Sequence, residues 1–225
     1  MDALRQSLID TGPSITIRTG SESANPCVLG DIYQDLHNIV IWRRELSADL
    51  MAGVDELLKS KRSLQVAISI TPQNALDAVR EALQGYPCAN ELSEDINALV
   101  EMFGCLFDLD CVGLRLAALD HAMCPRFHVD RVLCRLVTTY QGTATQWLPH
   151  HLVDRSKLGF GNNGLTDKLS GIYQSDSDIQ RLNQGDVALI KGELWQGNEN
   201  AGLVHRSPSP KPGERRLVLT LDVLE

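Results

Sequence analysis

Residues 127–130 read Phe-His-Val-Asp, and this short stretch indicates both a fold and a chemistry. In an extended segment, residues two apart project from the same face, so His128 and Asp130 present an imidazole and a carboxylate side by side. Both groups bind metal ions. A lone His-x-Asp pair is more often a hydrogen-bonded pair than a metal site, so a third ligand is needed from elsewhere. His205, directly before the last strand-like segment, is the candidate.

Two histidines and one carboxylate on one face of a metal ion leave the remaining positions open for substrate, cosubstrate and oxygen. This arrangement is typical of non-haem Fe(II) oxygenases. Arg215 and Arg216 follow His205 and open the last strand-like segment. A guanidinium binds a carboxylate through two parallel hydrogen bonds, so an arginine here suits the far end of a dicarboxylate that chelates the metal. Neighbouring strand residues face opposite sides, so only one of the two arginines can face the metal.

The spacing of the apolar residues changes near residue 112. Before it, apolar residues recur near helical spacing, and we expect helices over residues 29–60, with a break near Ser47, over Gln73–Leu83 and over Ser93–Phe107, with one strand at Ser63–Ile70. After it, alternating and β-branched segments predict strands over Val112–Leu119, Arg131–Tyr140, Asp186–Ile190 and Arg216–Val223. We therefore expect a helical N-terminal half packed on a C-terminal β-fold of the sandwich or small-barrel kind.

Five segments in a fixed order carry a resemblance to a known family: CPRFHVD at 124–130, TTYQGTATQWLP at 138–149, GDVALIKGELW at 185–195, HRSP at 205–208 and RRLVLTLD at 215–222. Together they resemble the bacterial DUF1826 family, and the order His-x-Asp, distal His and Arg is similar to the Fe(II)/2-oxoglutarate-dependent dioxygenase superfamily. This resemblance implies an α+β fold. A mainly helical N-terminal region, residues 1–111, would brace a double-stranded β-helix, or jelly roll, at residues 112–225, and the two would form one integrated domain.

The resemblance also implies roles for particular residues. His128, Asp130 and His205 would hold Fe(II) and form the catalytic centre, with 2-oxoglutarate as the cosubstrate. The cosubstrate carboxylate is assigned first to Arg216, because the arginine of the superfamily often precedes a Thr or Ser by four residues, as it does here. Arg215 is the second choice.

Two further residues are assigned to the same pocket, Tyr140 and Arg135, on the strand that follows the His-x-Asp segment. The implied function is hydroxylation of an unknown substrate. The same triad also binds Zn²⁺ or another divalent ion in place of iron, so the alternative is a cupin-like zinc hydrolase or a metal-homeostasis factor without oxygenase activity. A third interpretation is an inactive fold that serves as an interaction module. The carboxylate-binding arginine favours the oxygenase, since a zinc hydrolase has no need of it.

The composition is that of an ordinary globular protein: 225 residues, 43% hydrophobic and 22% charged, with a net charge of −8. The acidic balance argues against a generic nucleic-acid or anionic-membrane binder, which leaves small molecules as the expected partners. No apolar run is long enough to span a membrane and the N-terminus does not read as a signal peptide, so we expect a cytoplasmic protein. The six cysteines form no CxxC pair, and we expect reduced, mostly buried thiols, Cys105 and Cys111 among them.

Overall fold

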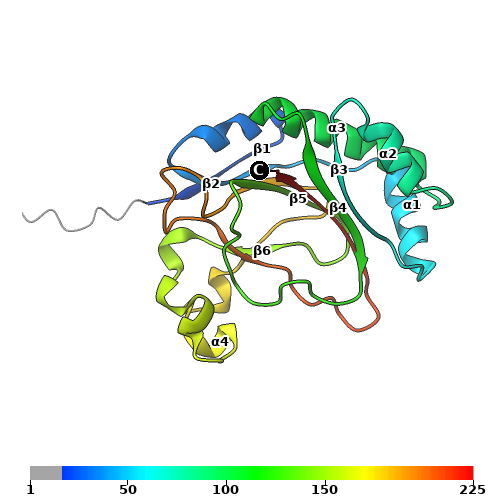
Figure 1. The fold of residues 1–225 in the computed structure, drawn as a ribbon. Coiled ribbons are helices and arrows are strands. Elements are labelled where there is room, and N and C mark those ends of the chain that lie inside the picture. The colour runs from blue at the N-terminus through cyan, green and yellow to red at the C-terminus, as the bar shows by residue number, and fades with distance from the viewer. Residues whose placement is uncertain (1–16, 225) are drawn as a thin grey trace, which may run out of the picture.

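The computed structural model describes residues 17–224, and two β-sheets form its framework (Figure 1). The large sheet has the strand order β1-β2-β8-β5-β10-β4-β3, built from β1 (Thr19–Ser23), β2 (His37–Trp42), β3 (Gln65–Ile70), β4 (Val112–Leu119), β5 (Cys134–Gln141), β8 (Val187–Lys191) and β10 (Arg216–Val223). The small sheet has the order β7-β6-β9, built from β6 (Gln146–Leu148), β7 (Gln180–Arg181) and β9 (Val204–Arg206).

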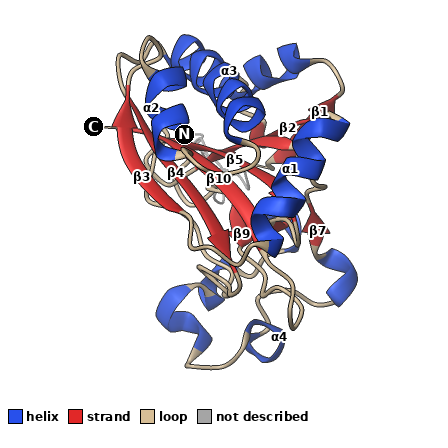
Figure 2. Cartoon of the chain, turned by 90° about the vertical axis from the view of Figure 1, so that its right-hand side faces the viewer, coloured by secondary structure: helices blue, strands red, loops and turns tan. Residues whose placement is uncertain are grey.

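The longer helices cover one face of the large sheet, as Figures 1 and 2 show. They are α1 (Ala48–Lys59), α2 (Ala75–Ala82) and α3 (Ala89–Phe107). A short α4 (Asp167–Ser170) and the 3-10 turns η2 (His150–Leu152), η3 (Arg155–Lys157), η4 (Gly159–Asn162) and η5 (Asp176–Asp178) lie between β6 and β7, while η1 (Pro26–Tyr33) joins β1 to β2. Ser47 accepts a hydrogen bond from the Leu50 amide and so caps the start of α1. Ser47 therefore marks the start of a helix, and not a break within one helix over residues 29–60 as predicted.

Alternation along the strands divides the apolar residues between two cores. On β10, Leu217, Leu219 and Leu221 point to the helices, while Val218 points to the small sheet. The core under the helices is the larger of the two, and the second core fills the space between the sheets. Successive side chains of a strand point to opposite faces of the sheet, so a single strand contributes to both cores. The same alternation decides which polar residues of β10 reach the space between the sheets.

Strand pairing places residues from distant parts of the sequence next to one another. β10 runs antiparallel to both β4 and β5, with Thr220 opposite Arg115 and Asp222 opposite Arg135. These pairs lie on the face that looks toward the small sheet. The register therefore brings charged side chains from three strands to one region of that face.

The predicted strands at Ser63–Ile70, Val112–Leu119 and Arg216–Val223 are confirmed, and so are the helices ending near Leu83 and Phe107. The helix predicted through residues 29–60 is wrong in part, because His37–Trp42 forms strand β2. This strand is paired on both sides, and Ile39, Val40 and Ile41 are all buried. A strand that is covered on both faces is apolar throughout. Its sequence then shows no alternation that would distinguish a strand from a buried helix.

The N-terminal region, predicted as a mainly helical brace over residues 1–111, also supplies strands to the large sheet. β1 and β2 form one edge of that sheet and β3 forms the other, on either side of strands from residues 112–225. The part of this region before residue 17 lies outside the described residues. The described chain is thus a mixed α/β fold, with the helices on one face of the large sheet.

The cysteines differ from expectation. Cys88 and Cys134 are buried, but Cys27, Cys105 and Cys124 are exposed, so the prediction of mostly buried thiols is wrong for these three. Cys105 is exposed because it lies on the face of α3 away from the buried residues, which run from Leu92 to Gly104. Within residues 17–224, no helix combines the length and the apolar character needed to cross a bilayer.

Candidate metal centre

The two histidines of the candidate triad are held together by their own backbones. The His128 amide donates to the His205 carbonyl over 3.0 Å, and the His205 amide donates back to the His128 carbonyl over 3.0 Å. This antiparallel bridge sets the imidazole ring centroids 4.7 Å apart. The pairing adds the segment around residue 128 to the edge of the small sheet beside β9.

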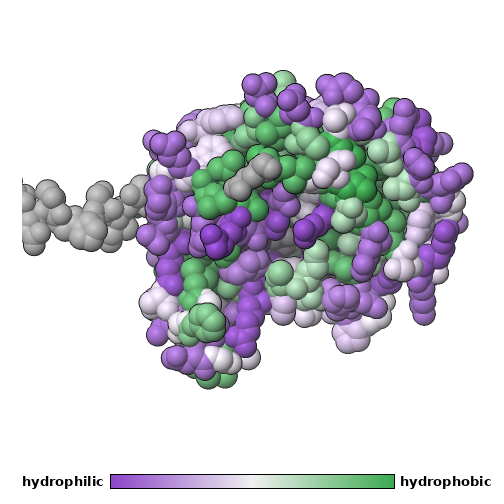
Figure 3. All heavy atoms as spheres, viewed as in Figure 1, coloured by the Kyte–Doolittle hydropathy of each residue, from purple (hydrophilic) through white to green (hydrophobic). Residues whose placement is uncertain are grey.

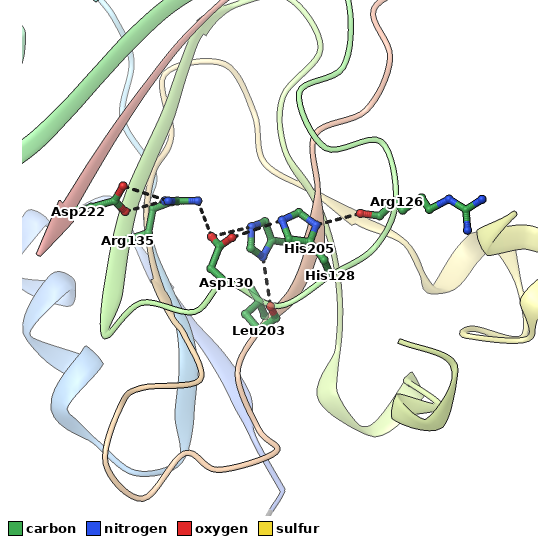
Figure 4. A network of polar contacts seen from close by, with 7 residues as sticks. All are labelled: Arg126, His128, Asp130, Arg135, Leu203, His205 and Asp222. Atoms are coloured by element: carbon green, nitrogen blue, oxygen red, sulfur yellow. Dashed lines mark hydrogen bonds and ion pairs between the residues drawn. The ribbon is translucent and has the colours of Figure 1, made fainter. Parts of the chain in front are cut away.

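Asp130 completes the cluster (Figure 4). Its Oδ1 lies 3.4 Å from Nε2 of His128, and its Oδ2 lies 3.3 Å from Nε2 of His205. One ligand atom from each of the three residues lies within 4.8 Å of the others. The three residues predicted as a metal triad therefore converge on one point, although 75 residues separate Asp130 from His205 (205 − 130).

Hydrogen bonds to backbone carbonyls fix the protonation of both rings. Nδ1 of His128 lies 2.9 Å from the Arg126 carbonyl oxygen, and Nδ1 of His205 lies 3.1 Å from the Leu203 carbonyl oxygen. A carbonyl oxygen only accepts, so each Nδ1 must carry the hydrogen. In the neutral imidazole this leaves Nε2 with its lone pair, which is the form that a metal ion needs. Two such nitrogens and one carboxylate fit Fe(II) and other divalent first-row ions.

Arg135 holds the carboxylate of the triad in place. Its Nη1 donates to Asp130 Oδ2 over 2.6 Å, while Nε and Nη2 donate to the two carboxylate oxygens of Asp222 over 2.7 and 3.0 Å. Burial alone would raise the pKa of Asp130, but hydrogen bonds from His128 and His205 and the nearby charge of Arg135 bring it well below its usual range. Asp130 is therefore an ionised candidate ligand, and its orientation is set by a neighbour on β5.

A cavity of about 250 Å³ opens beside the triad. Its wall includes His128 and His205, and it continues along the inner face of β10 past Thr220 and Val218 to Arg216. The remaining lining is mainly apolar, with Met123, Val137 and Ile190 among it. The two candidate ligands His128 and His205 and a buried arginine thus share one cavity between the sheets.

Arg216 places a buried positive charge in this cavity. Its side chain is buried, with the residue only 2% exposed, and Nε and Nη1 have no hydrogen-bond partner among the described residues. Burial lowers its pKa to about 10. A buried guanidinium without a partner is costly, and arginine favours planar anions that accept two parallel hydrogen bonds. The donor set therefore fits a carboxylate that enters the cavity.

The structure separates the two arginines that the sequence left as alternatives. Arg215 points to the other face of the sheet, where Nη1 and Nη2 donate to the carbonyl oxygens of Leu58 and Arg62, each over 2.9 Å. Arg216 faces the cavity. Of the two, Arg216 alone lies in the same space as the triad.

Tyr140 does not lie where it was expected. Its hydroxyl donates to Asp95 Oδ2 over 2.7 Å, on the helix side of the large sheet, and it belongs to the core there. The prediction that it lines the pocket is wrong, because residues five apart on a strand face opposite sides and Arg135 faces the pocket. Arg135 does line the cavity, but the ion pairs with Asp130 and Asp222 engage its guanidinium.

Three polar residues near the triad were not predicted. Asp222 anchors Arg135, and Arg115 and Thr145 line the cavity. For Arg115 a signal existed, since it is the one charged residue of an otherwise apolar strand, and Asp222 is likewise a charge within a mainly apolar strand. Their partners follow from the register of β10 against β4 and β5, and a single sequence does not reveal that register.

Comparisons with known proteins bear on the family and the fold of the chain. A sequence model of the family described as "Protein of unknown function (DUF1826)" matches residues 23–222. No curated protein matches the chain. Among solved structures, the chain is similar to the dioxygenase for auxin oxidation from rice, with a TM-score of 0.50 and 11% identity over 92% of this chain and 83% of that chain. It is also similar to dioxygenase for auxin oxidation 1 from Arabidopsis thaliana, solved with 2-oxoglutarate, with a TM-score of 0.51 and 9% identity over 92% of each chain. At such identity the likeness shows a shared fold.

Proposed function

The chain belongs to the DUF1826 family, and from this premise we propose that it is an Fe(II)- and 2-oxoglutarate-dependent oxygenase that hydroxylates a C–H bond of an organic substrate. Two observations beyond the family support the proposal. The fold is shared with two dioxygenases, one of them solved with 2-oxoglutarate. The His128, Asp130 and His205 cluster offers a donor set suited to Fe(II).

The observation that carries the proposal is the buried, unpartnered guanidinium of Arg216 in the cavity that His128 and His205 also line. A metal site alone would suit many reactions. A metal site together with a buried cation further along the same cavity suits a dicarboxylate that reaches from one to the other. 2-Oxoglutarate is such a molecule, with a chelating 2-oxo acid at one end and a second carboxylate at the other.

Each residue of the site then has a defined task. The triad holds the metal from one side, with both histidines in the Nδ1–H form, and Arg135 fixes the ligand oxygen of Asp130. Arg216 binds the far carboxylate of the cosubstrate. The two sheets form the walls of the cavity on either side of the triad.

The group bound there supplies the oxidising chemistry. Fe(II) held by His128, Asp130 and His205, with 2-oxoglutarate bound beside it, would supply oxidation by one O₂, with one oxygen atom going to succinate, the other to the new hydroxyl group of the substrate, and CO₂ as the further product. The atoms and electrons balance without a further reductant. The residues of the chain bind and orient the participants.

Anaerobic calorimetry tests the proposal, with Fe(II)-loaded protein titrated by 2-oxoglutarate. Wild type should bind, and Arg216→Met should bind at least about 100-fold more weakly, because two charge-assisted hydrogen bonds are lost. Arg215→Met is the matched control, since its guanidinium faces away from the cavity, and its affinity should stay near that of wild type. No binding by wild type, or equal losses in both variants, would overturn the proposal.

A further inference from the structure

Arg115 is the remaining cation of the cavity. It lies near the middle of β4, opposite Thr220 of β10, and its side chain is exposed where the cavity opens. No hydrogen bond or ion pair of its guanidinium occurs within the described residues 17–224. The two other arginines of the cavity have assignments, Arg135 to Asp130 and Asp222, and Arg216 to the cosubstrate. The proposed reaction therefore assigns no ligand to Arg115.

A second hollow meets the cavity at this residue. It has a volume of about 230 Å³ and is lined by Arg115 together with Ala67, Ser69, Gly113 and Leu224. These residues belong to β3, β4 and the end of the chain, on a part of the large sheet where Ala67 and Ser69 are exposed. Asp222 also borders it, but both of its carboxylate oxygens accept from Arg135. Arg115 is thus the unpaired charge at the junction of the two hollows.

Exposed apolar side chains lie on two sides of Arg115. Met123 is 45% exposed at the cavity, and Leu224 is 42% exposed at the adjoining hollow. On the side of the molecule viewed in Figure 1, Figure 3 shows hydrophilic side chains in a recess with hydrophobic surface beside them. An arginine with apolar neighbours on both sides suits a ligand that has an anionic group and an apolar body.

The volume of the cavity limits where that ligand can lie. Pockets for drug-sized ligands span roughly 300–1,000 Å³, and the cavity at the triad is smaller than this range. 2-Oxoglutarate would occupy its length between the metal and Arg216. A second molecule then has room at the mouth, next to Arg115 and extending over the adjoining hollow.

We propose that Arg115 is a substrate-binding residue, and that the substrate of this oxygenase is a small organic anion whose carboxylate, or a group of equivalent charge, pairs with Arg115. The inference rests on the proposed function, because it assigns the Arg216 end of the cavity to 2-oxoglutarate. The mouth of the cavity and the adjoining hollow would hold the apolar body, with the carbon to be hydroxylated turned toward the triad.

Matched pairs of acids and amides test this inference. The protein is loaded with Fe(II) and 2-oxoglutarate without oxygen, and thermal unfolding is followed with straight-chain carboxylates from acetate to octanoate and with their uncharged amides, at constant ionic strength. A ligand that binds the folded state raises the Tm, and at a fixed ligand concentration the rise is larger for a tighter ligand. We expect at least one acid to raise the Tm while its amide does not. In Arg115→Gln that acid should bind at least about tenfold more weakly.

Two controls separate this inference from the proposed function. Arg181→Gln removes an exposed arginine of β7 that does not line the cavity, and it should keep the acid response. Arg115→Gln should keep the 2-oxoglutarate affinity of wild type. Equal responses to acids and amides, or an acid response that survives in Arg115→Gln, would overturn the substrate assignment alone. A large loss of 2-oxoglutarate affinity in Arg115→Gln would show instead that Arg115 binds the cosubstrate. Failure of wild type to bind 2-oxoglutarate would overturn the proposed function.

Discussion

Arg135 donates from Nη1 to Oδ2 of Asp130 over 2.6 Å, and this contact ties the carboxylate of the candidate triad to the large sheet. The other two nitrogens of the same guanidinium, Nε and Nη2, donate to Asp222 on β10. The arginine therefore lies between a ligand and a structural carboxylate, and it restricts the rotation of Asp130 (Figure 4). Contacts of this kind orient metal ligands and are costly to remove.

Replacing Arg135 should weaken metal binding without removing a ligand. We expect Arg135→Met to bind Fe(II) or Mn(II) about 10- to 100-fold more weakly, since Asp130 loses the partner that orients it. Competition with a chelating dye measures the affinity. Asp222→Asn is the control, because it keeps the contact between Arg135 and Asp130, and it should show a smaller loss. Equal affinity in Arg135→Met and wild type would contradict an orienting role.

The buried charge of Arg216 should make the protein less stable than its fold allows. In the absence of 2-oxoglutarate, Arg216→Met should raise the free energy of unfolding by about 1–3 kcal/mol, because methionine fills the space without an unpaired charge. Urea denaturation measures this change. Arg215→Met should have the opposite sign, since it loses hydrogen bonds to the carbonyl oxygens of Leu58 and Arg62. Strong destabilisation by Arg216→Met would show that the guanidinium has a partner in the folded protein.

The pH dependence of metal binding follows from His128. Burial alone would lower its pKa, but hydrogen bonds with Asp130 and the Arg126 carbonyl oxygen and the charge of Asp130 raise it above the usual 6.5. In metal-free protein this imidazolium stabilises the fold below about pH 6.5, and the contribution is lost as the pH rises through the raised pKa. A metal ion needs the neutral ring, so binding should release a proton below that pKa.

Calorimetry in buffers of different ionisation enthalpy measures the released proton. More protons should leave per bound metal at pH 6.5 than at pH 8.5, and the metal affinity should fall toward the acid side. His128→Ala removes the titrating ring, and this variant should lose most of the metal affinity together with the extra proton release. A release that does not change with pH would contradict the assignment of His128 as a ligand.

The cysteines should differ sharply in reactivity. Burial raises the pKa of Cys88 to about 11, and it raises the pKa of Cys134 as well. Alkylation requires the thiolate, so iodoacetamide at pH 8 should modify the exposed Cys27, Cys105 and Cys124 well before these two. Peptide mass spectrometry locates the label. Early modification of Cys88 or Cys134 in folded protein would contradict the packing around them.

The triad could be predicted from the sequence because part of it is local. His128 and Asp130 lie two residues apart, and this spacing already puts both side chains on one face of an extended segment. The assignment of Arg216 was also within reach, although only the structure shows that Arg215 faces the other way. Tyr140 lies five residues after Arg135 on the same strand. Side chains an odd number of residues apart face opposite sides, so Tyr140 points away from the pocket.

Other features depend on contacts between distant strands. Arg115 lies at the cavity because β4 pairs with β10 in a register that sets it opposite Thr220. Asp222 meets Arg135 through the register of β10 with β5. Hydrophobic pattern specifies strands and their faces, but the choice of partner strand and register is a property of the whole fold. Strand β2 was missed for a related reason, since burial on both faces erases alternation.

The central claim is that 2-oxoglutarate chelates a metal ion held by His128, Asp130 and His205 while its far carboxylate meets Arg216. The most direct measurement is the visible absorption spectrum of the Fe(II)-loaded protein under anaerobic conditions, recorded before and after 2-oxoglutarate is added. Chelation of Fe(II) by a 2-oxo acid produces a charge-transfer band that neither component has alone. We predict this band in wild type and in Arg215→Met, its loss in His128→Ala, and its appearance in Arg216→Met only at much higher 2-oxoglutarate concentrations. No band in wild type at saturating iron and 2-oxoglutarate would contradict the account.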